Sequence, residues 1–179
     1  MLRKISDPPS KLYIEGNDKI LNTNCISIIG SRACSKEGAL IAQNFAKELA
    51  LQGLTIVSGM AKGIDSAAHK GALSVNGKTI AVLGCGLENI YPKENITLYK
   101  KIVENNGAVI TEYEKDVKAK SEYFLARNRI VSGLSLGILV IEAAHRSGTS
   151  VTARIAKMQN RKVFCIPHES ENYRGVRNE

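Results

Sequence analysis

The sequence predicts an α/β fold in which a mostly parallel sheet is covered by helices on both faces. Short apolar runs alternate with segments whose apolar residues recur at helical spacing. The runs follow one another at intervals of roughly 25 residues, as repeated βα units do. They are apolar at consecutive positions, which is typical of parallel strands buried on both faces. The chain has 179 residues, of which 44% are hydrophobic, and is therefore expected to form one ordered domain.

Strands and helices can be assigned in order along the chain. The six expected strands are 25–29, 54–57, 79–83, 108–111, 138–141 and 163–166. The five expected helices are 36–51, 66–75, 94–105, 122–134 and 149–159. Ser35 is placed to cap the first helix, and Gly53 is placed to end it. Residues 1–24 contain two consecutive prolines and are expected to form an extended lead-in to a domain that covers residues 25–179.

The formal net charge is +8 at pH 7, and most of it lies in one part of the chain. Residues 115–162 contain ten basic and three acidic side chains. A concentrated basic surface attracts polyanions, so nucleic acid is a candidate partner. The composition alone does not exclude a basic face that serves only solubility or an acidic protein partner.

Neither a metal site nor a cofactor is expected. The four cysteines form no C-x-x-C pair and have no histidine at ligand spacing, which argues against zinc and against a redox dithiol. The longest apolar runs have the length of strands, and the amino terminus has no targeting pattern. We therefore expect a cytoplasmic protein that does not cross a membrane.

Four glycine-containing loops follow apolar runs, and they are the strongest functional signal. They are 30–32, 58–65, 84–86 and 147–149. A parallel sheet brings such loops together at one edge, where free backbone N–H groups and the amino ends of helices bind phosphate. In the first loop, the hydroxyl of Ser31 and the guanidinium of Arg32 add donors for phosphate. The last loop is expected at least to cap the helix that follows it, and anion binding there is a further hypothesis.

Familiar nucleotide motifs are absent. Gly30 begins no G-x-G-x-x-G, and the next strand ends without a carboxylate for a ribose hydroxyl, which argues against a dinucleotide site. Residues 77–79 resemble the end of a P-loop but lead into a strand rather than out of one, so they are expected to form a turn. Asp65 is expected to cap the helix after the second loop, and His69 to share its hydrogen bond one turn later. No activated nucleophile is evident beside them.

The helix expected at 122–134 contains an arginine on its apolar face. At 100° per residue, Arg127 lies on the same face as Phe124, Ile130 and Val131. A buried arginine needs an anionic partner, and the sequence leaves two candidates: Glu142 at the end of the next strand, or a bound phosphate. Arg129 points away from this face and is expected to be exposed and to attract DNA by its charge.

Together these segments resemble the DNA-processing protein A family, also called DprA or Smf. The matching segments, which occur in the family's order, are 29–32, 57–59, 63–65, 67–73, 91–92, 127–130, 142–143 and 147–149. The resemblance implies an extended Rossmann-like domain, a three-layer α/β/α sandwich that binds single-stranded DNA without cutting it. It also implies a homodimer that helps to load RecA recombinase during DNA uptake and natural transformation. Pro167-His168 replaces the family's usual Pro-Gly, and the last core helix and two flanking domains of the family have no counterpart in the sequence.

The leading expectation is a binding protein rather than an enzyme, with no catalytic residue. The residues expected to bind DNA or its phosphates are Gly30, Ser31, Arg32, Ser58, Gly59, Ala61, Lys62, Gly63, Lys118, Lys120, Arg127, Asn128, Arg129, Ser147, Gly148 and Thr149. Aromatic residues make up only 5% of the chain, so electrostatic contacts are expected to dominate. The alternatives are a nucleotide-binding or nucleoside-monophosphate-hydrolysing enzyme, similar to the lysine-decarboxylase-like phosphoribohydrolases, and a protein-interaction scaffold.

Overall fold

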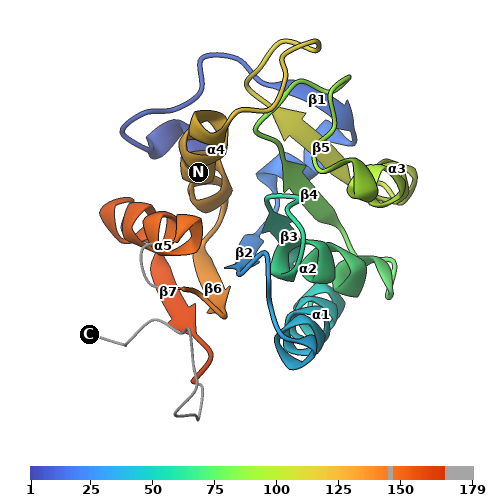
Figure 1. Ribbon diagram of the computed structural model, residues 1–179, viewed down its shortest axis with the longest axis vertical. Helices are drawn as coiled ribbons and strands as arrows, with labels where there is room; N and C mark the ends of the chain where they lie inside the picture. The colour runs from blue at the N-terminus through green and yellow to red at the C-terminus, as the bar shows by residue number, and fades with distance from the viewer. Residues whose placement is uncertain (145–146, 168–179) are drawn as a thin grey trace.

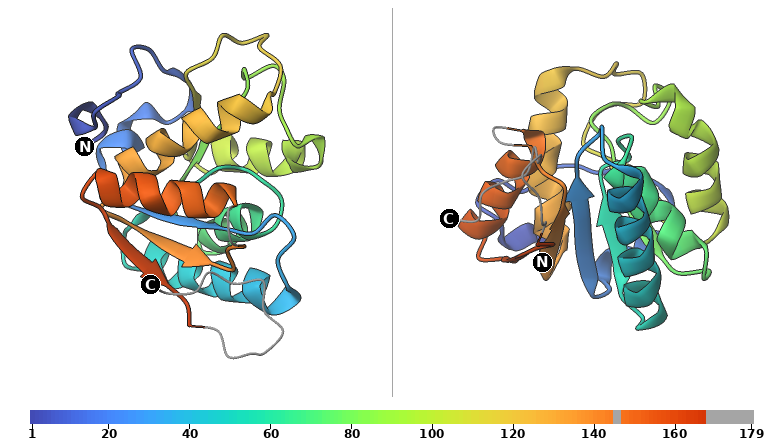
Figure 2. Two further views of the ribbon diagram at one scale, coloured as in Figure 1. Left: turned by 60° about the vertical axis from the view of Figure 1, so that its left-hand side comes forward. Right: turned by 60° about the horizontal axis from the view of Figure 1, so that its bottom comes forward.

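The computed structural model describes residues 1–144 and 147–167, and these form a seven-stranded sheet between two helical layers (Figures 1 and 2). The strands are β1 (Tyr13–Gly16), β2 (Cys25–Gly30), β3 (Thr55–Ser58), β4 (Thr79–Val82), β5 (Ala108–Thr111), β6 (Gly137–Ile141) and β7 (Lys162–Cys165). The helices are α1 (Lys36–Leu51), α2 (Ile64–Leu73), α3 (Ile96–Glu104), α4 (Ser121–Leu134) and α5 (Gly148–Met158). Three 3-10 helices are η1 (Leu2–Lys4), η2 (Asp18–Asn22) and η3 (Lys93–Asn95).

The sheet has the order β1-β5-β4-β3-β2-β6-β7. From β2 the chain adds β3, β4 and β5 on one side, and then crosses to add β6 and β7 on the other. All neighbouring pairs are parallel except β1 and β5, which are antiparallel. The direction of winding therefore reverses between β2 and β6, and in parallel sheets the carboxyl ends of two such strands border a natural binding crevice.

The two faces of the sheet bury separate apolar layers. Helices α1, α2 and α3 cover one face, and α4 and α5 cover the other, as Figure 2 shows from two sides. On the first face, Ala42 and Ala46 of α1 and Ala68 and Ala72 of α2 are fully buried, and these small side chains let the two helices pack closely. On the second face, the apolar stripe of α4 packs against β2, β3 and β4. This arrangement confirms the predicted α/β fold with a mostly parallel sheet.

The predicted elements agree with the structure to within about two residues at their ends. Ser35 caps α1 as expected: its hydroxyl oxygen accepts a hydrogen bond from the backbone N–H of Gly38 at 2.9 Å. Gly53 follows the helix with a φ of 81°, in the left-handed region that glycine adopts readily. The turn before β4 lies at residues 74–76, slightly earlier than predicted, and residues 77 and 78 link it to the strand.

The segment before Cys25 is more structured than the predicted extended lead-in. It contributes η1, β1 and η2, and β1 forms an antiparallel edge of the sheet against β5. Strand β1 has only four residues, of which three are exposed, so it lacks the apolar run that marks the other strands. The predicted domain boundary at residue 179, and the His168 departure from the family pattern, lie outside the described residues.

Candidate functional site

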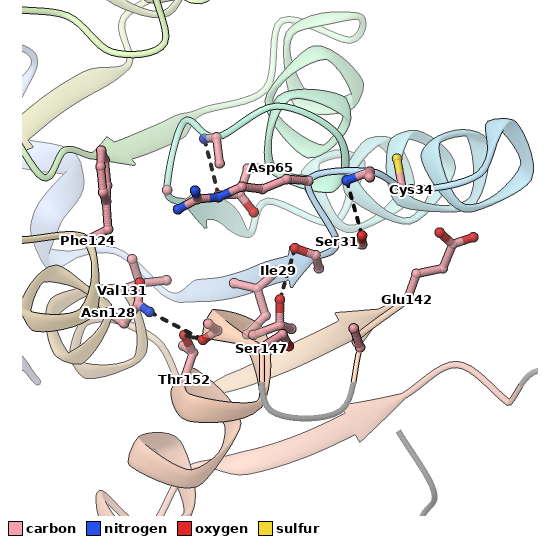
Figure 3. A pocket seen from close by; sticks show the side chains of 18 of the residues that line it. Ile29, Ser31, Cys34, Asp65, Phe124, Asn128, Val131, Glu142, Ser147 and Thr152 are labelled. Carbon is pink, nitrogen blue, oxygen red and sulfur yellow. Dashed lines mark hydrogen bonds between the residues drawn. The ribbon is translucent and has the colours of Figure 1, made fainter. Parts of the chain in front are cut away.

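A pocket of about 910 Å³ lies at the carboxyl edge of the sheet, where β2 and β6 diverge. Its walls are the loop after β2, the loop after β6, the start of the loop after β3, and one face of α4. Figure 3 shows that side chains from these segments and from the first turn of α2 point into one space, among them Ser31, Asp65, Phe124 and Glu142. The prediction that the glycine-containing loops meet at one edge is confirmed, because the strands before them are parallel, and three of the four loops line the pocket, the exception being 84–86.

The first loop runs close to its neighbours because Gly30 has no side chain. A Cβ at this position would overlap the carbonyl oxygen of Ile141 and the side chain of Ile64. The loop then turns: the hydroxyl oxygen of Ser31 accepts a hydrogen bond from the N–H of Ala33 at 3.2 Å. Arg32 follows on the surface, and its guanidinium carbon lies 5.3 Å from the ring centre of Phe124. The pocket therefore has an accessible cation over an aromatic face.

Arg127 forms part of the pocket floor. It is 3% exposed, and its Nη1 donates hydrogen bonds to the carbonyl oxygens of Gly59 and Val82. Gly59 is needed here, because a Cβ would overlap the guanidinium. Glu142, the carboxylate partner that the sequence offered, accepts hydrogen bonds from Ser35 instead. That pairing was wrong: backbone carbonyls, together with the charge of buried Asp65, take the place of the expected ion pair.

Asp65 organises the loop after β3. Its carboxylate accepts a hydrogen bond from the N–H of Ala61 at 3.3 Å, and Gly63, not Asp65, is the N-cap of α2, so the expected capping role was wrong. Burial raises the pKa of Asp65, while the charge of Arg127 acts in the opposite direction. The N–H of Ala61 is thus bound by the carboxylate of Asp65, and the carbonyl of Gly59 is bound by the guanidinium of Arg127. Together these contacts fix the loop.

His69 has a structural environment rather than a catalytic one. Its Nδ1 lies 2.7 Å from the hydroxyl oxygen of Thr79, and that hydroxyl donates to the carbonyl of Ile56 at 2.8 Å. Because Thr79 has a single hydroxyl proton, Nδ1 of His69 is assigned as the donor and Nε2 as unprotonated. Burial lowers the pKa of His69 to about 3, so the ring is neutral at physiological pH. The expected hydrogen bond shared with Asp65 is replaced by one to Thr79.

Two aromatic side chains of the pocket were missed by reasoning from the sequence. The guanidinium carbons of Arg32 and Arg127 lie 5.3 and 5.8 Å from the ring centre of Phe124. Tyr91 is half exposed and packs against Phe124 with a ring separation of 5.6 Å. The helical pattern had placed Phe124 on the apolar face of α4, and only its position three residues before Arg127 links it to the site. An accessible aromatic ring beside cations can bind a flat, electron-rich group such as a nucleobase.

The loop after β6 is tied to the first loop. The hydroxyl of Thr149 donates to the carbonyl of Gly30 at 3.0 Å, and the side-chain amide of Asn128 donates to the carbonyl of Gly148 at 3.4 Å. Ser147 caps α5 by accepting a hydrogen bond from the N–H of Ser150 at 3.3 Å. The capping role predicted for this loop is confirmed. Asn128, Ser147, Gly148 and Thr149, all predicted binding residues, line the pocket.

Comparison with protein families shows which family the chain belongs to. The family model of the DNA recombination-mediator protein A matches residues 1–178. The chain belongs to this family. Protein Smf of Escherichia coli K12 is 47% identical over 162 residues, which cover 90% of this chain and 43% of that protein. The DNA processing protein DprA of Streptococcus pneumoniae is 44% identical over 166 residues, which cover 93% of this chain and 58% of that protein. The chain therefore spans about half the length of these curated relatives.

Solved structures of DprA share the fold. The Streptococcus pneumoniae DprA crystal structure superposes with a TM-score of 0.90 at 42% identity, covering 96% of this chain and 60% of that one. DprA of Helicobacter pylori, described for its single-stranded DNA binding mode, superposes with a TM-score of 0.89 at 36% identity, covering 96% of this chain and 79% of that one. A molybdenum cofactor carrier protein of Chlamydomonas reinhardtii, at 18% identity and a TM-score of 0.54, shares the fold alone.

Two basic residues expected to bind DNA in this DprA-family chain are paired with carboxylates. Nη1 and Nη2 of Arg129 each donate to Glu112 at 2.7 Å, and its Nε donates to Asp7 at 2.9 Å. The side chain is only 16% exposed, so the expectation of a freely exposed cation was wrong. Nζ of Lys62 lies 2.6 Å from a carboxylate oxygen of Glu94. Neither Arg129 nor Lys62 lines the pocket.

The remaining predicted residues surround the pocket without lining it. The hydroxyl of Ser58 is buried and donates to the carbonyl of Ile28, and Gly63 starts α2. Lys118 and Lys120 lie in the segment before α4, where the ammonium of Lys120 lies 5.3 Å from the ring centre of Tyr123.

Within residues 1–144 and 147–167, no group of three or more histidine, cysteine or acidic side chains is arranged to hold a metal ion. No helix in the same part of the chain is long and apolar enough to span a bilayer.

Proposed function

We propose that this chain binds single-stranded DNA at the pocket and does not cleave it. The observation that carries the proposal is the exposed guanidinium of Arg32 over the ring of Phe124, within a pocket of nucleotide size. A cation beside a stacking surface is the combination that single-strand binding uses. Membership of the DNA recombination-mediator protein A family and the likeness to Helicobacter pylori DprA support the same ligand.

The pocket offers different groups to different parts of a nucleotide. Arg32 provides donors for a phosphate, and Phe124 and Tyr91 provide faces on which a base can stack. Lys118 and Lys120 would contact the sugar-phosphate chain where it leaves the pocket. Both stacking and charge therefore contribute, whereas the sequence alone led us to expect mainly charge.

We favour binding over catalysis because the acid–base groups near the pocket are already hydrogen-bonded within the fold. Asp65 accepts from Ala61, and Glu142 accepts from Ser35. His69 is buried and is held in its neutral form. The alternative, hydrolysis of a nucleoside monophosphate, predicts free base as a product. Release of free base by the purified chain would overturn the proposal of a non-enzymatic protein.

Membership of the family also supports a proposal for the role of the chain in the cell. We propose that the chain acts as a homodimer in the cytoplasm, that it helps to load RecA recombinase onto DNA, and that it does so in DNA uptake, natural transformation and recombination. The support is the family match and the similarity to DprA proteins. Co-sedimentation of RecA with DNA coated by this chain, compared with DNA alone, tests the RecA part of the proposal.

Fluorescence anisotropy of labelled oligonucleotides tests the ligand. We expect single-stranded DNA to bind more tightly than duplex DNA of the same length, because a base inside a duplex cannot reach Phe124. Arg32→Ala should weaken binding by about tenfold, the value of one charge-assisted contact, and should lower the salt slope by roughly 0.7. Arg154→Ala is the matched control, since Arg154 is exposed on α5 and does not line the pocket. Equal effects of the two substitutions would remove Arg32 from the binding site.

A further inference from the structure

The amino end of α1 is occupied by a carboxylate of the chain itself. The side chain of Glu142 accepts a hydrogen bond from the backbone N–H of Ser35 at 2.7 Å and a second one from the Ser35 hydroxyl. It also packs on the first turn of α1, where a Cβ on Gly38 would overlap it. Glu142 has a φ of 50°, an uncommon conformation for a side chain of this kind, and it lines the pocket.

This position is the one in which a helix would otherwise bind a phosphate group of a ligand. The free N–H groups and the dipole at a helix amino end favour an anion, and the crevice between β2 and β6 directs ligands to this end. Here an internal anion already satisfies the N–H of Ser35. A ligand phosphate must therefore bind elsewhere in the pocket and must tolerate a neighbouring negative charge.

The charged groups that line the pocket determine which anions it binds. The described lining residues include two guanidinium groups, Arg32 and Arg127, and two carboxylates, Asp65 and Glu142. Arg127 and Asp65 are buried in the floor and influence each other's pKa. The more accessible charges are thus Arg32, which attracts phosphate, and Glu142, which repels it. An attractive and a repulsive charge in one pocket discriminate between anions by their charge.

We propose that Glu142 is a selectivity residue that keeps the pocket from preferring a phosphomonoester to a phosphodiester. An internal phosphate of a DNA strand carries one negative charge, whereas a terminal phosphate or a free nucleotide carries almost two above pH 7. The carboxylate repels the second charge as well as the first, so it offsets the advantage that Arg32 would otherwise give to the monoester. This inference rests on the proposed binding of DNA at the pocket. It implies that the chain engages the interior of a strand in the presence of free nucleotides.

The wild-type chain itself tests the proposal. A labelled oligothymidylate is displaced at about pH 8, well above the second pKa of a phosphomonoester, near 6. The competitors are thymidine 5′-phosphate and its monomethyl ester, which differ mainly in one unit of charge, at matched ionic strength. We expect the monoester to compete no better than the methyl ester, because Glu142 offsets the extra attraction of Arg32 for the second charge. Better competition by the monoester would overturn the proposal.

Variants then assign the selectivity to Glu142. Glu142→Gln keeps an oxygen that can accept from Ser35 but removes the charge, so the monoester should gain about fivefold relative to the methyl ester, the effect of one charge several ångströms from a carboxylate near a protein surface, and oligonucleotide binding should tighten. Glu142→Asp should keep the wild-type ratio of the two competitors. Glu37→Gln is the matched control, because Glu37 is exposed in the first turn of the same helix and does not line the pocket. An unchanged ratio in a folded Glu142→Gln chain would also overturn the proposal, and failure of the labelled oligonucleotide to bind would instead refute the DNA-binding function.

Discussion

Replacing Arg127 separates its two possible roles, as a structural residue and as a DNA contact. Its guanidinium is 3% exposed and binds the carbonyls of Gly59 and Val82. Arg127→Met fills similar space but leaves both carbonyls without this donor. A charged hydrogen bond contributes roughly 1.5–3 kcal/mol, and the removal of a buried, costly charge offsets part of the loss. We therefore expect the free energy of unfolding to fall by about 2–4 kcal/mol.

Urea unfolding at neutral pH measures this change, with Arg32→Met as the control for loss of an exposed arginine of the same pocket. Arg32→Met should alter stability by less than about 0.5 kcal/mol. DNA affinity is measured on the fraction of Arg127→Met that remains folded. If Arg127→Met leaves the free energy of unfolding within about 0.5 kcal/mol of wild type but reduces DNA affinity as much as Arg32→Met does, then the structural interpretation of Arg127 is wrong. In that case Arg127 would serve mainly to bind the ligand.

Three further predictions follow from contacts outside and inside the pocket. Arg129→Gln should lower the free energy of unfolding by about 1–3 kcal/mol, because it breaks the two-pronged ion pair with Glu112, while DNA affinity changes less than twofold; anisotropy and urea unfolding check both parts. Phe124→Leu should weaken single-strand binding by about tenfold without changing the salt slope, since stacking carries no charge, and a changed slope would contradict a stacking role. His69 has a folded pKa of about 3 against an ordinary value of 6.5, so its stabilising effect is complete above pH 6.5 and is lost as the pH falls towards 3. Between pH 6.5 and 5 the wild type should lose about 2 kcal/mol relative to His69→Asn, which urea titrations at the two pH values measure.

The convergence of the loops was predictable because it follows from topology. Apolar runs at βα spacing imply a parallel sheet, and a parallel sheet brings the loops after its strands to one edge. The pattern also placed Arg127 correctly on the buried face of α4. Both inferences use only periodicity along the chain, which sequence records directly.

The partners of the charged residues were not predictable in the same way. Arg127 meets carbonyls that lie 68 and 45 residues away along the chain, and every residue has a carbonyl, so no residue type marks the contact. Arg129 meets Asp7 from the amino-terminal segment, which folds back onto α4 through η1. The ring of Phe124 carried an apolar signal that is the same for a core residue and for a pocket wall. Such contacts depend on how distant segments pack, and periodicity does not report that.

The charge of the chain is therefore a poor guide to the charge of the site. The basic segment 115–162 includes Arg129, whose charge is cancelled by Glu112 and Asp7, and Arg127, whose charge is buried against carbonyls and Asp65. Arg32, which lies outside that segment, lines the pocket together with Glu142. Among the lining residues that the structure describes, one accessible cation stands beside one accessible carboxylate, so charge alone holds DNA weakly there. The aromatic faces of Phe124 and Tyr91 must then supply much of the affinity, and bases in single strands expose the surfaces that such faces require.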